Sequence, residues 1–136
     1  MSSQSQPIYH LVPADYFHRQ PENSAYRPES FAVEGFIHCT TGLDTLLEIA
    51  NAFFADQADD LLVLEIDPTR LTVPLKFEPP IPPASANPEM FIPDPGLLFP
   101  HIYGPLKRQA IKHVFALQRD ATGMWQLPII TSPNQD

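Results

Sequence analysis

The sequence predicts an α+β fold on three observations. Several short runs of β-branched and aromatic residues end at prolines or polar turns, which is typical of strands. One segment, over about residues 42–55, has strong helical periodicity. The predicted strands do not alternate with helices, and this disfavours a doubly wound parallel sheet.

The length of the chain indicates its number of domains, and its charge disfavours some classes of partner. The 136 residues suit one domain, expected at 8–131, with a disordered N-terminus at 1–7 and a polar tail at 132–136. Sixteen acidic residues against eight Lys and Arg give a net charge of -8. This charge disfavours nucleic acid and anionic lipid as partners, because both attract basic proteins.

The sequence also predicts the compartment. We find no apolar run near 18 residues and no secretory signal features, so we expect no membrane association and a cytoplasmic protein. A single cysteine, Cys39, excludes an internal disulfide and a zinc site with several cysteines.

The first third of the chain is predicted to hold two strands and a short helix. Pro13 suits the first turn of the short helix, and Pro21 ends it. In order, we expect a strand at 8–12, a helix at 14–20, a loop at 22–34 with one turn near 28–31, and a strand at 35–39.

The main helix is predicted from one apolar face. The apolar residues that recur at intervals of three and four are Leu43, Leu46, Leu47, Ala50, Phe53 and Phe54. We expect Thr41 to be the N-cap, with Asp44 in a position like that of a capping box.

The remaining segments are predicted to be mostly strands. Residues 61–66 are apolar on both faces and suit a central strand. A proline-rich insertion at 79–98 is expected to adopt polyproline II or to form an ordered lid. The other expected elements are strands at 75–78, 99–105 (at a sheet edge), 111–117 and 124–127, a turn at 106–110, and a hairpin turn at 120–123.

Three of the five histidines lie in predicted strands beside aromatic residues: His10, His38 and His101. Each alone is explained by a core histidine that bonds a backbone carbonyl. Together they suggest proton transfer or ligand capture, since imidazole titrates near neutral pH. We expect His18 and His113 on the surface. No metal site is expected, because no metal-binding spacing is present.

The junction between the second strand and the main helix is a candidate anion seat. Thr40, Thr41 and Gly42 lie where free backbone N–H groups gather, although plain capping by Thr41 explains the same residues. Cys39 is expected to pack under the sheet, because strand neighbours point to opposite faces and His38 therefore cannot activate it. Glu65, within an apolar strand, needs a partner or a function.

The order of several motifs resembles the bacterial domain-of-unknown-function family 952, over about residues 8–118. The segments that carry the resemblance are 8–11, 34–40, 50–54, 61–64, 76–78 and 99–106. It implies a fold similar to ADP-ribosyltransferases and RNA 2′-phosphotransferases, with two small, mostly antiparallel sheets around a cleft that holds NAD in active relatives. Three features depart from the family: Thr40 in place of serine, Asp44 in place of glutamine, and the long insertion.

The resemblance also implies roles for individual residues. His10 matches a histidine that contacts a ribose, Thr40 matches a residue near the nicotinamide, and His38 and His101 match the other two histidines. Phe77 and Glu78 match a tryptophan–glutamate pair.

We therefore expect a nucleotide-binding cleft, with NAD as a substrate and no certain cofactor. The expected catalytic residues are His10, His38, His101 and Glu78, and the expected nucleotide-binding residues are His10, Thr40, Thr41 and Tyr103. The expected activity is ADP-ribosyl transfer or phosphotransfer. Two alternatives stay open: a non-catalytic nucleotide- or anion-binding module, and an interaction domain that uses its proline-rich segment. Both the enzyme and the non-catalytic binding module require the three imidazoles to converge beside the N-terminus of the main helix.

Overall fold

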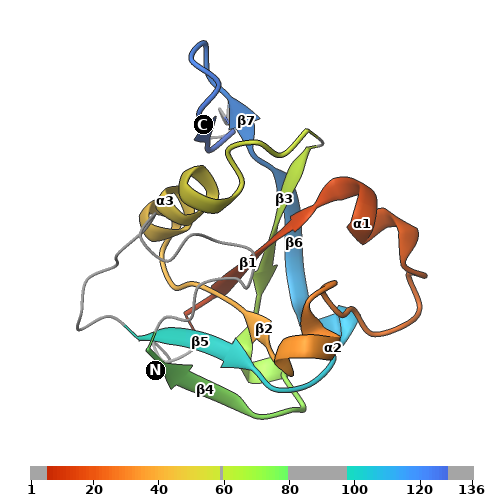
Figure 1. Ribbon diagram of the computed structural model, residues 1–136. Helices are drawn as coiled ribbons and strands as arrows, with labels where there is room; N and C mark the ends of the chain where they lie inside the picture. The colour runs from red at the N-terminus through yellow and green to blue at the C-terminus, as the bar shows by residue number, and fades with distance from the viewer. Residues whose placement is uncertain (1–5, 59, 80–97, 129–136) are drawn as a thin grey trace, which may run out of the picture.

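The computed structural model describes residues 6–58, 60–79 and 98–128 (Figure 1). Its small antiparallel sheets and few helices confirm the α+β class. The expected termini and the proline-rich insertion fall largely outside the described residues. Within these residues, no helix is long and apolar enough to cross a membrane. The elements are β1 (Ile8–Pro13), α1 (Ala14–Arg19), α2 (Phe31–Glu34), β2 (Ile37–His38), α3 (Leu43–Phe53), β3 (Leu61–Ile66), the 3-10 helix η2 (Pro68–Arg70), β4 (Leu75–Glu78), β5 (Phe99–Ile102), the 3-10 helix η3 (Arg108–Ala110), β6 (Ile111–Ala116), β7 (Gln118–Arg119) and β8 (Trp125–Gln126).

The first sheet has the strand order β1-β3-β6, with both pairs antiparallel. The central place of β3 was predicted from its continuous apolar run. Five of its six residues are buried, which confirms that both faces of the strand are covered.

The second sheet has the order β2-β5-β4, again antiparallel. The prediction of an edge strand at 99–105 is wrong, because β5 ends at Ile102 and lies in the middle of the sheet. Pro100 is tolerated there for a local reason. Its carbonyl accepts the Cys39 N–H at 3.0 Å, so its missing N–H faces the end of the short β2 and not β4.

One residue pair joins the two sheets. Tyr9 of β1 and Thr40, just after β2, exchange two backbone hydrogen bonds of 2.8 Å. Because paired residues share a face, the face of the β2–β5–β4 sheet that bears Thr40 continues onto the face of β1 that bears Tyr9.

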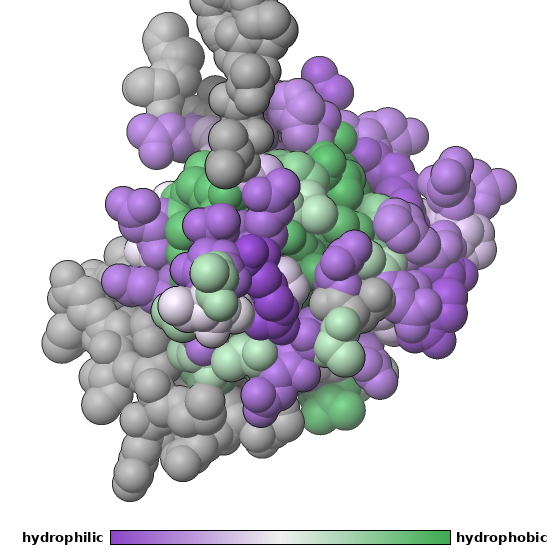
Figure 2. All heavy atoms as spheres, turned by 90° about the horizontal axis from the view of Figure 1, so that it is seen from above, coloured by the Kyte–Doolittle hydropathy of each residue, from purple (hydrophilic) through white to green (hydrophobic). Residues whose placement is uncertain are grey.

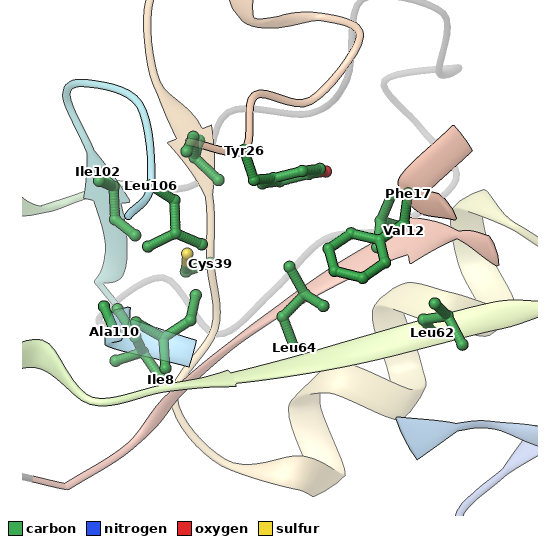
Figure 3. Close-up of a cluster of buried hydrophobic side chains, with 12 residues drawn as sticks. Ile8, Val12, Phe17, Tyr26, Cys39, Leu62, Leu64, Ile102, Leu106 and Ala110 are labelled. Atoms are coloured by element: carbon green, nitrogen blue, oxygen red, sulfur yellow. The ribbon is translucent and has the colours of Figure 1, made fainter. Parts of the chain in front are cut away.

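Two hydrophobic cores lie on opposite faces of the first sheet. The first core includes Cys39, which is 3% exposed and packs near Ile8, Leu106 and Ala110, as Figure 3 shows. The predicted packing role of Cys39 is thus confirmed. Burial raises the pKa of its thiol, which keeps the sulfur protonated and inert.

The second core lies between α3 and the β1–β3 face. Leu46 and Ala50 of α3 pack there with Leu11 and Val63, which confirms the apolar face predicted for this helix. On the side of the molecule seen in Figure 2, hydrophilic residues cover much of the coloured surface, and hydrophobic residues are visible between them.

Local backbone geometry corrects two boundaries. Thr41 is not the N-cap of α3; Gly42 holds that place with a φ of 88°, and no side chain caps the helix. The predicted strand at 35–39 is shorter, because Gly35 caps the end of α2 with a φ of 82°, a conformation that glycine adopts without strain. Strand β7 was not predicted, whereas the predicted hairpin turn at 120–123 is present.

Candidate functional site

One face of the β2–β5–β4 sheet gathers most of the predicted site residues. Strand alternation and pairing register place His38, His101 and Lys76 in one cross-strand row on this face, with Glu78 two residues beyond Lys76. We call this surface the histidine face. It consists of Phe36, His38, Thr40, Lys76, Glu78, Phe99, His101 and Tyr103.

His101 is held by a glutamate from the neighbouring strand. Its Nδ1 donates to Glu78 Oε1 at 2.7 Å, and the Tyr103 hydroxyl donates to the same oxygen at 2.6 Å. These two hydrogen bonds, that from Tyr103 first, lower the pKa of Glu78. An ionised Glu78 therefore fixes the tautomer of His101 and leaves Nε2 as the reactive nitrogen.

His38 is held in the same way by a second glutamate. Its Nε2 donates to Glu34 Oε1 at 2.8 Å, so Nδ1 is the remaining nitrogen. Glu34 is the last residue of α2, and Gly35 turns the chain from this helix towards β2. Burial lowers the pKa of His38, and Glu34 opposes this effect, so the imidazole is neutral at pH 7.

The two imidazoles lie against each other. Their ring centroids are 5.5 Å apart in an edge-on arrangement, and Phe36 packs against both at 4.7 Å from His38 and 4.4 Å from His101. Within residues 6–58, 60–79 and 98–128, neither His38 Nδ1 nor His101 Nε2 has a hydrogen-bond partner. The pair therefore has two imidazole nitrogens without a partner in those ranges. The His101 side chain is 1% exposed, whereas that of His38 is 29% exposed.

His10 does not join the histidine face. It shares the inner face of β1 with Ile8 and Val12, in the first core. Its Nδ1 donates to the His38 carbonyl at 2.7 Å, and its Nε2 accepts the Tyr26 hydroxyl at 2.8 Å. Burial lowers the pKa of His10 to about 4, so the ring is neutral. Both nitrogens are thus used inside the protein, and His10 supports the backbone of His38.

The threonines lie at the end of this face nearest α3. Thr40 is 4% exposed, and strand alternation places it on the same face as His38. Thr41 is half-buried and does not cap α3. The N-terminal turn of α3 therefore keeps its backbone N–H groups uncapped by side chains, as an anion seat requires.

The remaining titratable candidates lie elsewhere. His18 and His113 are exposed, as predicted. Glu65 has the partner that its place in an apolar strand demands, since the Nδ1 of His113 lies 3.3 Å from its Oε1. In the part of the chain that the structure describes, no three His, Cys, Asp or Glu side chains gather as a metal site.

Two members of this arrangement were not singled out from the sequence. Glu34 falls in a segment predicted to be loop, and only its position four residues before His38 hinted at contact. Lys76 was predicted to lie in a strand, but its place beside His101 depends on the β4–β5 register. Its Nζ lies 4.9 Å from the centroid of the Tyr103 ring.

The fold and the site define a small α+β protein with a pair of glutamate-held histidines on one sheet face. The chain belongs to the family described as "Protein of unknown function (DUF952)", whose model matches residues 11–114. This confirms the family predicted from the sequence motifs. No curated protein sequence shows significant similarity to the chain.

Solved structures of one bacterial protein have the same fold. The crystal structure of protein CC0527 from Caulobacter crescentus is 25% identical, with a TM-score of 0.66, and the match covers 89% of this chain and 94% of that one. The solution structure of CC0527 is also 25% identical, with a TM-score of 0.62 and coverages of 90% and 93%. A double mutant of CC0527 matches at 24% identity, with a TM-score of 0.66 and coverages of 89% and 94%.

Proposed function

We propose that the protein binds a nucleotide of the NAD or ADP-ribose class at the histidine face and transfers a group at its ribose or phosphate. The observation that carries this proposal is the His38–His101 pair, in which each imidazole is oriented by its own glutamate. An imidazole with one nitrogen fixed by a carboxylate presents the other as a defined acid or base. Two such groups 5.5 Å apart can bracket one reacting centre.

The surroundings support a nucleotide as the ligand. The uncapped N-terminus of α3 and the buried Thr40 suit a phosphate at one end of the face. The two small sheets joined at Tyr9 and Thr40 are consistent with the ADP-ribosyltransferase-like arrangement that the family resemblance implies. In this proposal His10 is a positioning residue, because it acts through the His38 carbonyl.

Ligand-dependent melting tests the proposal. We expect NAD or ADP-ribose at 100 times its Kd to stabilise the fold by about 2.7 kcal/mol, a shift of several degrees. His38→Ala should reduce this shift. His113→Ala should not, because His113 pairs with a glutamate on the other sheet and is a matched control.

Product analysis then separates the two hypotheses that remain open. Melting shifts with a product, nicotinamide or a cleaved phosphoester, indicate an enzyme. Melting shifts without a product indicate a binding module that keeps the site without turnover. Melting temperatures unchanged by NAD, ADP-ribose and related nucleotides would refute both.

A further inference from the structure

The middle row of the histidine face places three nitrogen-bearing side chains in succession. His38 and His101 are direct cross-strand partners, and Lys76 is the partner of His101 on its other side. Lys76 is exposed and contributes a basic side chain to the row beside the two imidazoles. On a chain with a net charge of -8, this row offers one basic side chain and two imidazole nitrogens to a ligand. Such a row suits the oxygens of a phosphate group.

Both carboxylates of the site are hydrogen-bonded to the imidazoles. Glu78 accepts hydrogen bonds from both His101 and Tyr103, and Glu34 accepts one from His38. Cleavage of the glycosidic bond of NAD needs a carboxylate that faces the sugar and stabilises an oxocarbenium-like charge. Phosphoester transfer needs instead a base, an acid and positive charge around phosphorus.

We propose that this site transfers or hydrolyses phosphoesters of nucleotides, with His38 as the general base and His101 as the general acid. The inference rests on the proposed function and selects the phosphate over the glycosidic bond as the reacting group. Lys76 holds a non-bridging phosphate oxygen. Glu34 and Glu78 are positioning residues, because each acts through the histidine that it orients.

On a nucleoside 2′,3′-cyclic phosphate, the reaction is hydrolysis of one of the two bonds between phosphorus and a ribose oxygen. Water gives a proton to Nδ1 of His38 as its oxygen forms a bond to phosphorus. The bond from phosphorus to one ribose oxygen breaks, and that oxygen takes the proton from Nε2 of His101. The product is a nucleoside monophosphate. A proton passed from His38 to His101 through solvent restores the starting state.

The mechanism requires a neutral His38 and a protonated His101. Among the described residues, the titratable groups that face the pair are Glu34 from α2, Glu78 and Lys76 from β4, Tyr103 after β5, and His10 of β1, which touches the His38 carbonyl. Because opposite protonation states are needed, the rate should depend on pH as a bell-shaped curve.

The test compares two substrates on the full chain. Adenosine 2′,3′-cyclic monophosphate is followed by phosphorus NMR, and NAD is followed by release of nicotinamide. We expect opening of the cyclic phosphate with a bell-shaped pH profile, and no nicotinamide. His38→Ala and His101→Asn should each lower kcat by about 10²–10⁴-fold. Asparagine is chosen at position 101 because its side-chain N–H can still donate to Glu78. The variant therefore keeps the contact that supports the fold and loses only the imidazole. His113→Ala should leave kcat unchanged.

A further variant separates positioning from structural support. Glu34→Gln can still accept the His38 N–H, but it removes the negative charge that favours the imidazolium. We expect the acid limb of the pH profile to move to lower pH, a change that a purely structural role would not produce.

Each outcome decides between the proposals. Nucleotide binding without cleavage of the cyclic phosphate, or nicotinamide release that depends on His101, overturns this inference and leaves the nucleotide site standing. Failure of both nucleotides to bind, measured by calorimetry, overturns the proposed function itself. Cleavage that survives His38→Ala and His101→Asn together also overturns the inference.

Discussion

The buried imidazole of His10 should make the stability of the protein depend on pH. Its pKa is about 4 in the folded protein and 6.5 in an unfolded chain, because burial disfavours the charged ring. Between these values the unfolded chain binds a proton that the folded protein does not. The free energy of unfolding therefore falls as pH falls from above 6.5 to about 4.

The magnitude follows from the size of the shift. One pKa unit corresponds to about 1.36 kcal/mol, so the full loss is about 3 kcal/mol, of which about 2 kcal/mol falls between pH 7.5 and pH 5. His38, whose pKa burial also lowers, adds a loss of the same sign. Most carboxylates remain ionised above pH 5, so this window isolates the histidines.

Urea unfolding of the wild type and of His10→Gln at several values of pH between 5 and 7.5 measures the effect. The variant is expected to be less stable at pH 7.5, but its free energy of unfolding should vary less with pH by about 2 kcal/mol. Titration of the imidazole nitrogens by NMR gives the pKa directly, even if the variant does not fold. An equal pH dependence in both proteins, or a His10 pKa above 6, would refute the reasoning.

Three further substitutions test the packing around the site. Tyr26→Phe removes the hydroxyl that donates to a buried imidazole nitrogen, and should cost about 1–3 kcal/mol in urea unfolding; no loss would mean that water replaces it. Asn51→Leu removes two hydrogen bonds between α3 and Trp125, and should cost about 1–3 kcal/mol while changing the fluorescence of the single tryptophan. Gly104→Ala brings a Cβ to 2.5 Å from Val73 Cγ1, and should lower stability by about 1–3 kcal/mol; an unchanged Tm would show that the backbone yields.

Much of the fold could be predicted because periodicity reports local burial. The apolar face of α3 and the two buried faces of β3 are properties of neighbouring residues, and both were confirmed. The cap of α3 was predicted wrongly, because Thr41 has the right chemistry but the chain reaches the helix through Gly42 in a left-handed conformation. The central place of β5 was also not predicted. A proline disfavours a central strand, and Pro100 is tolerated here because the neighbouring strand β2 is only two residues long.

The amino-acid sequence by itself determined most of the strands and the main helix, which side chains are apolar, and that His38, His101 and Glu78 lie in strands. Only the tertiary structure decided their partners: it set His38 against His101, gave each a glutamate, and turned His10 into the core with Tyr26. The physical reason is that alternation along a strand depends on adjacent residues. Contacts between strands depend on register and strand order, which arise from packing of the whole chain.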